Sequence, residues 1–262
     1  MLLTDKFSVF DFFSDGIKHS VYRLGDGSKP GVLIIQELPG IGKQTIALAE
    51  RLHRDGFTVY LPHLFGQFNA PITPVRNLVK LCVNLEFRLL ANRRRSPISD
   101  WLRALSRKIS EECNGSIGAI GMCLTGGFVL TLMMDESVSA PVLSQPTHLG
   151  GFKESNQETL GVPQADLDAA ISRSKRDDIE VLGLRFTGDK ACTKSRFDKL
   201  ESLFGDRFRR VEIDSSLFNE EKIQPFAHAV LTLDFKDQEN HPTMTAYRNV
   251  VEFFNEKIGN QG

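Results

Sequence analysis

The sequence predicts an α/β protein in which one mostly parallel β-sheet is covered by helices on both faces. Short apolar runs of strand length alternate along the chain with longer segments whose apolar residues recur every three or four positions. The run that starts at residue 31 is almost continuously apolar, as in a parallel strand buried on both sides. With 262 residues, 41% of them hydrophobic, the chain can build a sizeable core, and we expect one domain spanning residues 1–262.

The expected strands begin with a hairpin. Asp15-Gly16 is a dipeptide typical of tight turns, and short strands flank it. A strand, a helix that ends near Gly56, and a second strand then form a β-α-β unit, whose crossover is right-handed almost without exception. The expected strands cover residues 6–13, 19–24, 31–37, 58–62, 117–122, 140–143, 181–187 and 208–213.

The expected helices follow from apolar residues at helical spacing. In the first, these are residues 46, 48, 49 and 52. Ser99-Asp100 is expected to open the helix that carries Trp101, and the final helix is amphipathic, with Val250, Phe253 and Phe254 on one side. The further expected helices cover residues 73–92, 99–109, 128–133, 165–174, 194–204 and 243–258.

The segment at residues 118–127 has the sequence form of a nucleophile elbow. It enters as an apolar strand, leaves as a helix, and places Cys123 at the corner with Gly121 two residues earlier. The sharp turn requires small residues around it. The amides and dipole of a helix N-terminus favour a thiolate at such a corner. The alternative is that Cys123 is a buried small hydrophobe beside a glycine-rich turn.

Polar residues at the carboxyl ends of the expected strands suggest a catalytic site, because ligands and substrates bind at this edge of open α/β sheets. Cys123 ends one strand, Asp189 follows the next-to-last strand, and His228 comes after the last one. Nucleophile, acid and histidine in this order are typical of hydrolase triads. The three supply a nucleophile, an anion that fixes the imidazole tautomer, and a base near neutral pH. Glu37, at the end of an earlier strand, joins this group.

Each of these residues also has a structural interpretation. Asp189 could cap the helix that starts near Thr193, and His228 could be a core histidine, since its neighbours are apolar. His241, which precedes a proline, is the main rival for the base. His53 and His148 fit the order of a triad less well.

Composition excludes other classes of function. The formal net charge is -1, which gives no global attraction to nucleic acid or to a membrane surface. Four cysteines without paired short spacing indicate neither a zinc site nor a disulfide framework, so we expect no metal and no cofactor. No segment reaches signal-peptide character or the ~18 apolar residues of a membrane span, so we expect a soluble, cytoplasmic protein.

Two further motifs carry little functional weight. Residues 40–45 (GIGKQT) lie between a strand and a helix, as a phosphate-binding loop does, but Gln44 occupies its Ser/Thr position. Glu37 stands where that loop has its first glycine, and its charge would repel phosphate. The run Arg93 to Arg95 is most often a solvated helix end.

Four segments together resemble the dienelactone hydrolase family: residues 36–41 (QELPGI), 59–66 (VYLPHLFG), 121–124 (GMCL) and 226–229 (FAHA). The resemblance runs from about residue 31 to the C-terminus. It implies an α/β-hydrolase fold and an enzyme that cleaves a small-molecule carboxylic ester or lactone, of the carboxymethylenebutenolidase type, as a monomer or homodimer.

The resemblance also implies roles for single residues. Cys123 matches the family's nucleophile, His228 its base and Asp189 its orienting acid. Glu37 matches the glutamate that contacts the resting cysteine. The backbone amides of Leu38 and Leu124 match the oxyanion hole.

The chain departs from the family pattern at three places. Thr125 stands where the family has a glycine two residues after the cysteine, and a β-branched residue at this crowded turn could shift the elbow. Thr232 replaces the arginine with which dienelactone-cleaving members grip the substrate carboxylate, and residues 69–92 do not match those members closely. The natural substrate therefore stays open. Two alternatives to an ester hydrolase are a catalytically degenerate binding protein of the same fold and a cysteine redox sensor.

Overall fold

A computed structural model of the chain describes residues 6–38, 40–66, 68, 96–148 and 157–259. The helix predicted at residues 73–92, the arginines at 93–95 and Cys82 lie outside these residues.

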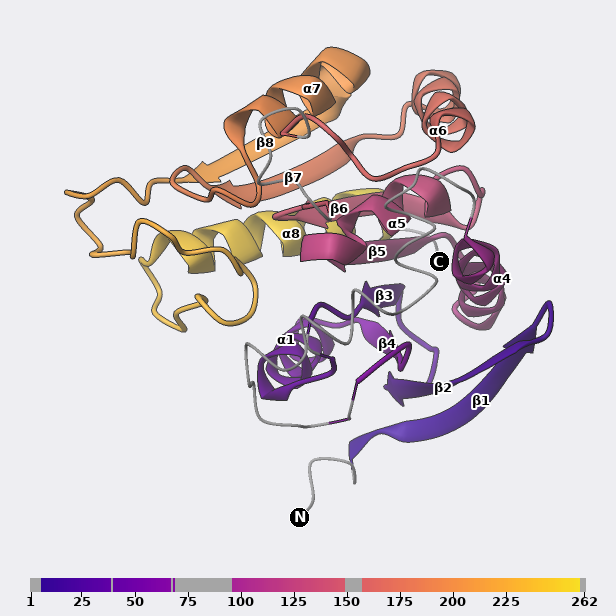
Figure 1. The fold of residues 1–262 in the computed structure, drawn as a ribbon. Coiled ribbons are helices and arrows are strands. Elements are labelled where there is room, and N and C mark those ends of the chain that lie inside the picture. Colours follow the sequence, from indigo (N-terminus) through magenta and orange to yellow (C-terminus); the bar gives the residue numbers. More distant parts are fainter. Residues whose placement is uncertain (1–5, 39, 67, 69–95, 149–156, 260–262) are drawn as a thin grey trace.

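The centre of the fold is an eight-stranded sheet with the strand order β1-β2-β4-β3-β5-β6-β7-β8 (Figure 1). The pairs β1–β2 and β2–β4 are antiparallel, and every pair from β4 to β8 is parallel. The mostly parallel sheet predicted from the sequence is therefore confirmed. The strands are β1 (Ser8–Ser14), β2 (Ile17–Leu24), β3 (Gly31–Ile35), β4 (Thr58–Pro62), β5 (Ile117–Met122), β6 (Val138–Ser144), β7 (Val181–Phe186) and β8 (Phe208–Ile213).

The β1–β2 hairpin closes through the two-residue turn at Asp15 and Gly16. Both residues have a positive φ, 49° and 80°, and Ser14 pairs directly with Ile17 across the turn. Two successive left-handed residues give the turn the twist that the flanking strands require. Asp-Gly is suited to this geometry, so the hairpin signal in the sequence was correct.

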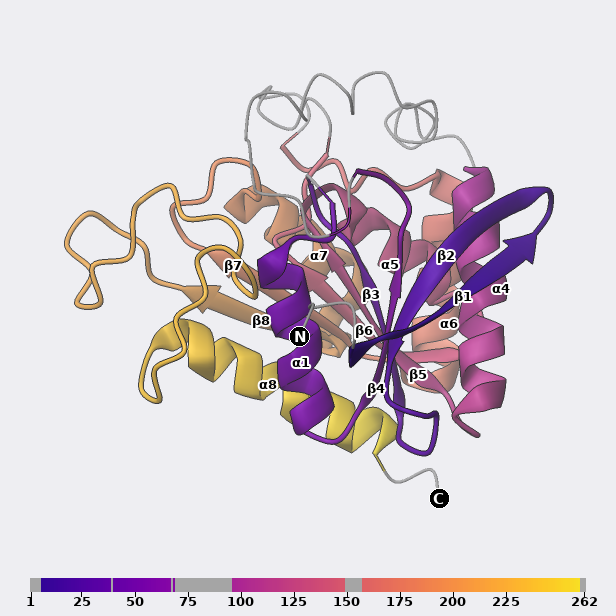
Figure 2. The same ribbon diagram turned by 90° about the horizontal axis from the view of Figure 1, so that it is seen from below.

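Helices cover both faces of the sheet (Figure 2). Buried side chains of α1 and α8 pack on one face, whereas those of α4, α5, α6 and α7 pack on the other. Apolar residues every third or fourth position put one stripe of each helix against the strands. The helices are α1 (Lys43–Arg54), α4 (Pro97–Glu112), α5 (Gly126–Leu132), α6 (Gln164–Asp177), α7 (Lys194–Phe204) and α8 (Pro242–Ile258), with short 3₁₀ turns η2 (Cys123–Thr125) and η4 (Gly205–Arg207).

The predicted boundaries agree best with the observed ones for elements that have turn signals at both ends. The bounds of β4, α7 and β8 are those predicted, and α7 begins after Thr193, whose hydroxyl accepts a hydrogen bond from Arg196 N. The prediction that Ser99-Asp100 opens α4 was wrong by two residues. The helix begins at Pro97, because a proline at the first helical position loses no hydrogen bond and has a helical φ.

Strand β3 ends at Ile35, two residues before the predicted end. Gln36 and Glu37 thereby leave the ladder at the carboxyl edge of the sheet, where Gly40 N donates to Glu37 O (2.9 Å) and closes a tight turn. None of the helices in the described ranges is both long enough and apolar enough to cross a membrane.

Candidate active site

Cys123 lies at the corner between β5 and α5. Its φ is +56°, a left-handed conformation that a non-glycine residue rarely adopts. Gly121 makes the corner possible: a Cβ added there would lie 2.5 Å from Thr125 O and 2.7 Å from Val129 Cγ2. A strained residue between a strand and a helix, with no room for a side chain at the preceding glycine, is the geometry of a nucleophile elbow.

Thr125 does not disrupt this elbow, contrary to the concern raised by its β-branched side chain. It is buried, and its hydroxyl accepts a hydrogen bond from Met122 N (3.0 Å) while it donates to Met122 O (2.8 Å). Ile35 O of the neighbouring strand lies 3.2 Å from the same hydroxyl. The close approach falls instead on Gly126, where an added Cβ would lie 2.7 Å from Pro146 Cβ. Thr125 thus ties the turn to β3.

Asp189 and His228 form a short hydrogen-bonded pair. Asp189 follows β7, and His228 lies on the long connection between β8 and α8 (Figure 1). His228 Nδ1 is 2.6 Å from Asp189 Oδ2, and Ala191 N donates to the other carboxylate oxygen (2.8 Å). Because a carboxylate accepts, Nδ1 carries the proton, and Nε2 is left for another partner. The side chain of Asp189 is 3% exposed and that of His228 28%.

Cys123 is the other electrostatic partner of the imidazole. Burial by itself lowers the pKa of His228, but the charge of the Cys123 thiolate, the hydrogen bond to Asp189 and a hydrogen bond to Cys123 more than offset it. The pKa of His228 therefore lies well above its usual value. A proton is favoured on the imidazole when a thiolate stands beside it. The structure brings together the three residues that the sequence order predicted as a triad.

Asp234 and Gln145 hold the loop that carries His228, and neither was predicted from the sequence. Asp234 Oδ2 accepts hydrogen bonds from His228 N and Ala229 N, both 2.9 Å long. Gln145, buried at the end of β6, accepts a hydrogen bond from Val230 N (3.2 Å). These contacts fix the backbone of His228 and of the two residues after it. A local signal for Asp234 did exist, since an aspartate often accepts bonds from nearby amides in a loop.

Glu37 lies beside the same loop. Thr232 Oγ1 donates to Glu37 Oε1, and Gln145 Nε2 donates to Glu37 Oε2 (3.4 Å). The prediction that Glu37 contacts the Cys123 thiol is not met by these bonds and stays a prediction. Glu37 does not cap the following helix, because the N-cap of α1 is Gly42, with no side-chain cap.

His241 and Thr193 are helix N-caps in the structure. His241 is the N-cap of α8, where its Nδ1 accepts a hydrogen bond from Thr243 N (3.2 Å). Burial lowers the pKa of His241. Thr193, and not Asp189, caps α7. Among the residues that the structure describes, no three His, Cys, Asp or Glu side chains gather as metal ligands.

The sequence profile of the dienelactone hydrolase family matches residues 20–182, more than half of the chain. The chain belongs to the dienelactone hydrolase family. Membership in this family supports hydrolase activity and a small-molecule substrate. No curated protein sequence matches the chain.

Solved structures of dienelactone hydrolases have the same fold. A dienelactone hydrolase from Anabaena variabilis superposes with a TM-score of 0.61 at 14% identity, over 97% of this chain and 99% of that one. A dienelactone hydrolase-like promiscuous phosphotriesterase from metagenomic libraries gives 0.62 at 13% identity, over 97% and 98%. An esterase of Pyrococcus furiosus gives 0.56 at 12% identity, over 99% and 95%. At these identities the likeness shows the α/β-hydrolase fold alone.

Within this family member, Thr232 is bonded to another residue of the site. It stands at the position where dienelactone-cleaving relatives were expected to have an arginine, it is buried, and its hydroxyl is bonded to Glu37. A hydroxyl engaged in this way supplies no positive charge to a substrate. In the structure the side chain at position 232 therefore binds Glu37.

We expect Glu37→Gln to change how stability depends on pH. Burial, and to a smaller extent the charge of Asp234, raises the pKa of Glu37. The hydrogen bonds of the carboxyl group and the charge of His228 lower it, but the net shift is upward. The stability that comes from its neutral form is complete below the unfolded pKa of about 4.3 and is lost as pH rises through the raised folded value. Glutamine stays neutral, so the variant should gain stability relative to the wild type across this window, by up to ~1.4 kcal/mol per pH unit.

Urea unfolding from pH 4.5 to 8 measures this difference. Altered hydrogen bonds at position 37 would change the free energy of unfolding by the same amount at every pH, so they leave its dependence on pH unaffected. Glu111→Gln, at an exposed position on α4, is the matched control and should run parallel to the wild type. Parallel curves for Glu37→Gln as well would contradict the prediction.

Proposed function

We propose that the protein hydrolyses a carboxylic ester or lactone through a thioester acyl-enzyme on Cys123. The observation that supports this most strongly is the line from Asp189 through His228 to Cys123, with the cysteine on a left-handed elbow and the imidazole bonded to the carboxylate at 2.6 Å. Nucleophile, base and orienting anion are the three components of a triad.

Acylation begins from the state in which His228 holds the proton of the Cys123 thiol, so that Cys123 is a thiolate. The thiolate attacks the carbonyl carbon of the ester, a C–S bond forms, and the carbonyl electron pair moves to the oxygen. When the tetrahedral intermediate collapses, the C–O bond to the leaving group breaks. The alkoxide takes the proton from His228 Nε2, while Asp189 keeps the imidazolium in place. For a lactone, the alcohol released is still attached to the acyl group.

Deacylation repeats the same steps with water. His228 removes a proton from the water, and the oxygen attacks the thioester carbon. The C–S bond then breaks, which releases the carboxylic acid and returns the proton to the Cys123–His228 pair. No oxidant, reductant or cofactor takes part.

The oxyanion of both intermediates needs donors, and the backbone amides of Leu38 and Leu124 are the proposed ones. Leu124 is the second residue of the 3₁₀ turn that starts at Cys123, and amides in the first turn of a helix have no partner within the helix. Leu38 follows Glu37 in the turn after β3. Donors of this kind are fixed before the reaction and typically contribute about 10²–10³-fold to the rate.

A short pulse of an activated ester followed by mass spectrometry tests this function. With p-nitrophenyl acetate, the wild-type chain should gain one acetyl group, and peptide mapping should place it on Cys123. A degenerate binding protein would gain no acetyl group. A redox sensor would instead take up oxygen on Cys123 in peroxide, reversibly and without releasing p-nitrophenol. Acetylation of another residue with Cys123 unmodified contradicts the proposed function.

A further inference from the structure

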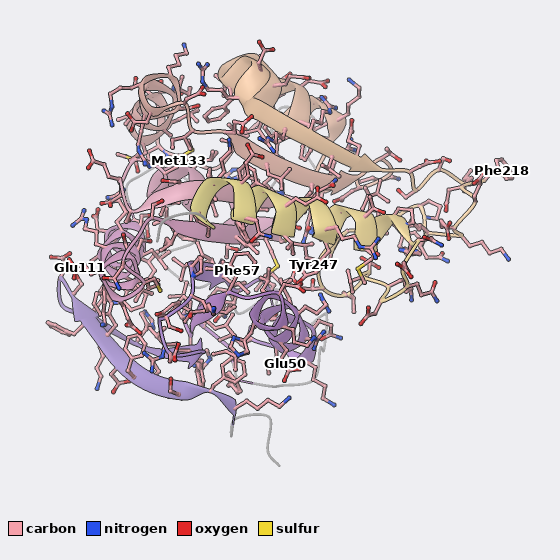
Figure 3. The ribbon with its side chains drawn as sticks, turned by 180° about the vertical axis from the view of Figure 1, so that it is seen from behind. Glu50, Phe57, Glu111, Met133, Phe218 and Tyr247 are labelled. Carbon is pink, nitrogen blue, oxygen red and sulfur yellow. The ribbon has the colours of Figure 1, made fainter. Side chains whose placement is uncertain are left out.

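A cavity lies between α1 and α8, away from the elbow. Its volume is about 290 Å³. In Figure 3, Tyr247 projects from α8 toward α1, and its hydroxyl donates to Asp55 Oδ2 just beyond the end of α1. The lining residues are Arg51, Arg54, Asp55, Asp237, Met244, Tyr247, Arg248, Val251 and Glu252.

Arg51 is a buried cation whose donors are largely unused. It is 9% exposed, and Nη2 donates to Leu231 O (2.8 Å), but Nε is buried and has no acceptor among the residues that the structure describes. The guanidinium stacks on Phe235, 3.8 Å from the ring centroid, and lies 5.4 Å from that of Tyr247. The charges of Asp237 and Asp55 also stabilise the guanidinium, but a buried donor that is left without an acceptor is costly.

Two further arginines line the same cavity. Arg54 follows Arg51 by three residues on α1, so the two like charges share one side of the helix, which is unfavourable without a counter-ion. Among the described residues, neither Arg51 nor Arg54 is within ion-pair distance of a carboxylate. Arg248 of α8 is 3.5 Å from Glu239, a residue that is itself largely exposed.

The other lining residues limit what the cavity can hold. Asp55, Asp237 and Glu252 add negative charge, which opposes a doubly charged anion such as phosphate. Met244 and Val251 offer apolar surface. We propose that this cavity binds a small organic monocarboxylate, whose charge pairs with the arginines and whose apolar body packs against α8.

Arg51 connects the cavity to the loop that carries His228. Leu231, whose carbonyl Arg51 binds, lies between His228 and Asp234. An occupant would therefore share Arg51 with the loop that carries His228. The proposed site does not depend on the chemistry of Cys123, and its test needs no turnover.

The ε-methyl group of Met244 is a direct probe of occupancy. The full-length chain is labelled at its five methionines with ¹³C-methyl groups, and the Met244 signal is assigned by its loss in Met244→Leu. Benzoate is the carboxylate titrated. We expect a saturable shift of the Met244 signal, and a half-saturation concentration at least about tenfold higher when Arg54→Gln and Arg248→Gln are combined. Both positions are exposed, so the fold should persist.

Arg176→Gln is the matched control, because Arg176 is an exposed helical arginine on α6 outside this cavity. It should leave the titration unchanged. The proposal is overturned if benzoate gives no saturable shift of Met244. It is also overturned if the double variant binds as tightly as the wild type, or if inorganic phosphate saturates the signal at a lower concentration than benzoate.

Discussion

Cys123→Ala is expected to abolish detectable turnover of p-nitrophenyl acetate. The elbow, the imidazole and the oxyanion donors stay in place in this variant, but the atom that forms the acyl-enzyme is gone. Removal of a nucleophile alone costs about as much as removal of a whole triad. The measurement is steady-state release of p-nitrophenol at pH 7 by purified variants with matching circular dichroism spectra.

Two further variants sharpen this test. Cys123→Ser keeps the size of the side chain and a proton for His228 to remove, but an alcohol ionises far less readily than a thiol, so activity should be severely impaired. Cys113→Ser is the matched control: the same exchange of sulfur for oxygen at a partly buried cysteine on another element should have a modest effect. Wild-type turnover by Cys123→Ala would refute the mechanism.

The fold could be predicted from the sequence because its local signals agree with its tertiary structure. Strand β4 is buried throughout and ends at a proline, and the Asp15-Gly16 turn specifies the β1–β2 register. The predicted boundaries of an element were wrong by one or two residues where two sequence signals for that boundary competed. At the start of α4, Ser99-Asp100 resembles a helix start, but Ser96 is already extended and Pro97 is already helical. Which signal prevails depends on packing.

The candidate site was predictable only in its local parts. Cys123 lies in a contiguous motif, and the order of Cys123, Asp189 and His228 along the chain reflects how parallel strands deliver their ends to one edge. The supports of the site are contacts between distant segments. Gln145 is 85 residues from Val230, whose amide it binds, and Thr232 is 195 residues from Glu37. A single sequence carries no periodicity or spacing that reveals such a pair.

Thr125 shows why a departure from a family pattern need not be a defect. From the sequence alone, a β-branched residue at the elbow was a reason to doubt the turn. In the structure its hydroxyl bonds to both polar groups of Met122, so the side chain stabilises the turn that it was expected to strain. The space restriction belongs to Gly121 and Gly126, which flank it.

His228→Ala is expected to lower kcat/KM for the same ester by about 10²–10⁴-fold, the usual cost of losing a general base. The imidazole has two roles here, since it takes the thiol proton and returns it to the leaving group. Its pKa lies well above the ordinary value, because the Cys123 thiolate and Asp189 outweigh burial. Loss of the imidazole proton should cause a fall in rate on the alkaline side of the wild-type profile, and this fall should disappear in the variant.

His241→Ala separates this role from that of a structural histidine. His241 is buried at the N-terminus of α8 and accepts a hydrogen bond from Thr243 N, so its loss removes a helix cap worth about 0.5–2 kcal/mol. We expect a lower Tm for His241→Ala with kcat/KM near that of the wild type below the transition, and the reverse pattern for His228→Ala. If His241→Ala loses more activity than His228→Ala at equal folded fraction, the base has been assigned to the wrong histidine. The bond between His228 and Asp189 would then serve only to hold the loop.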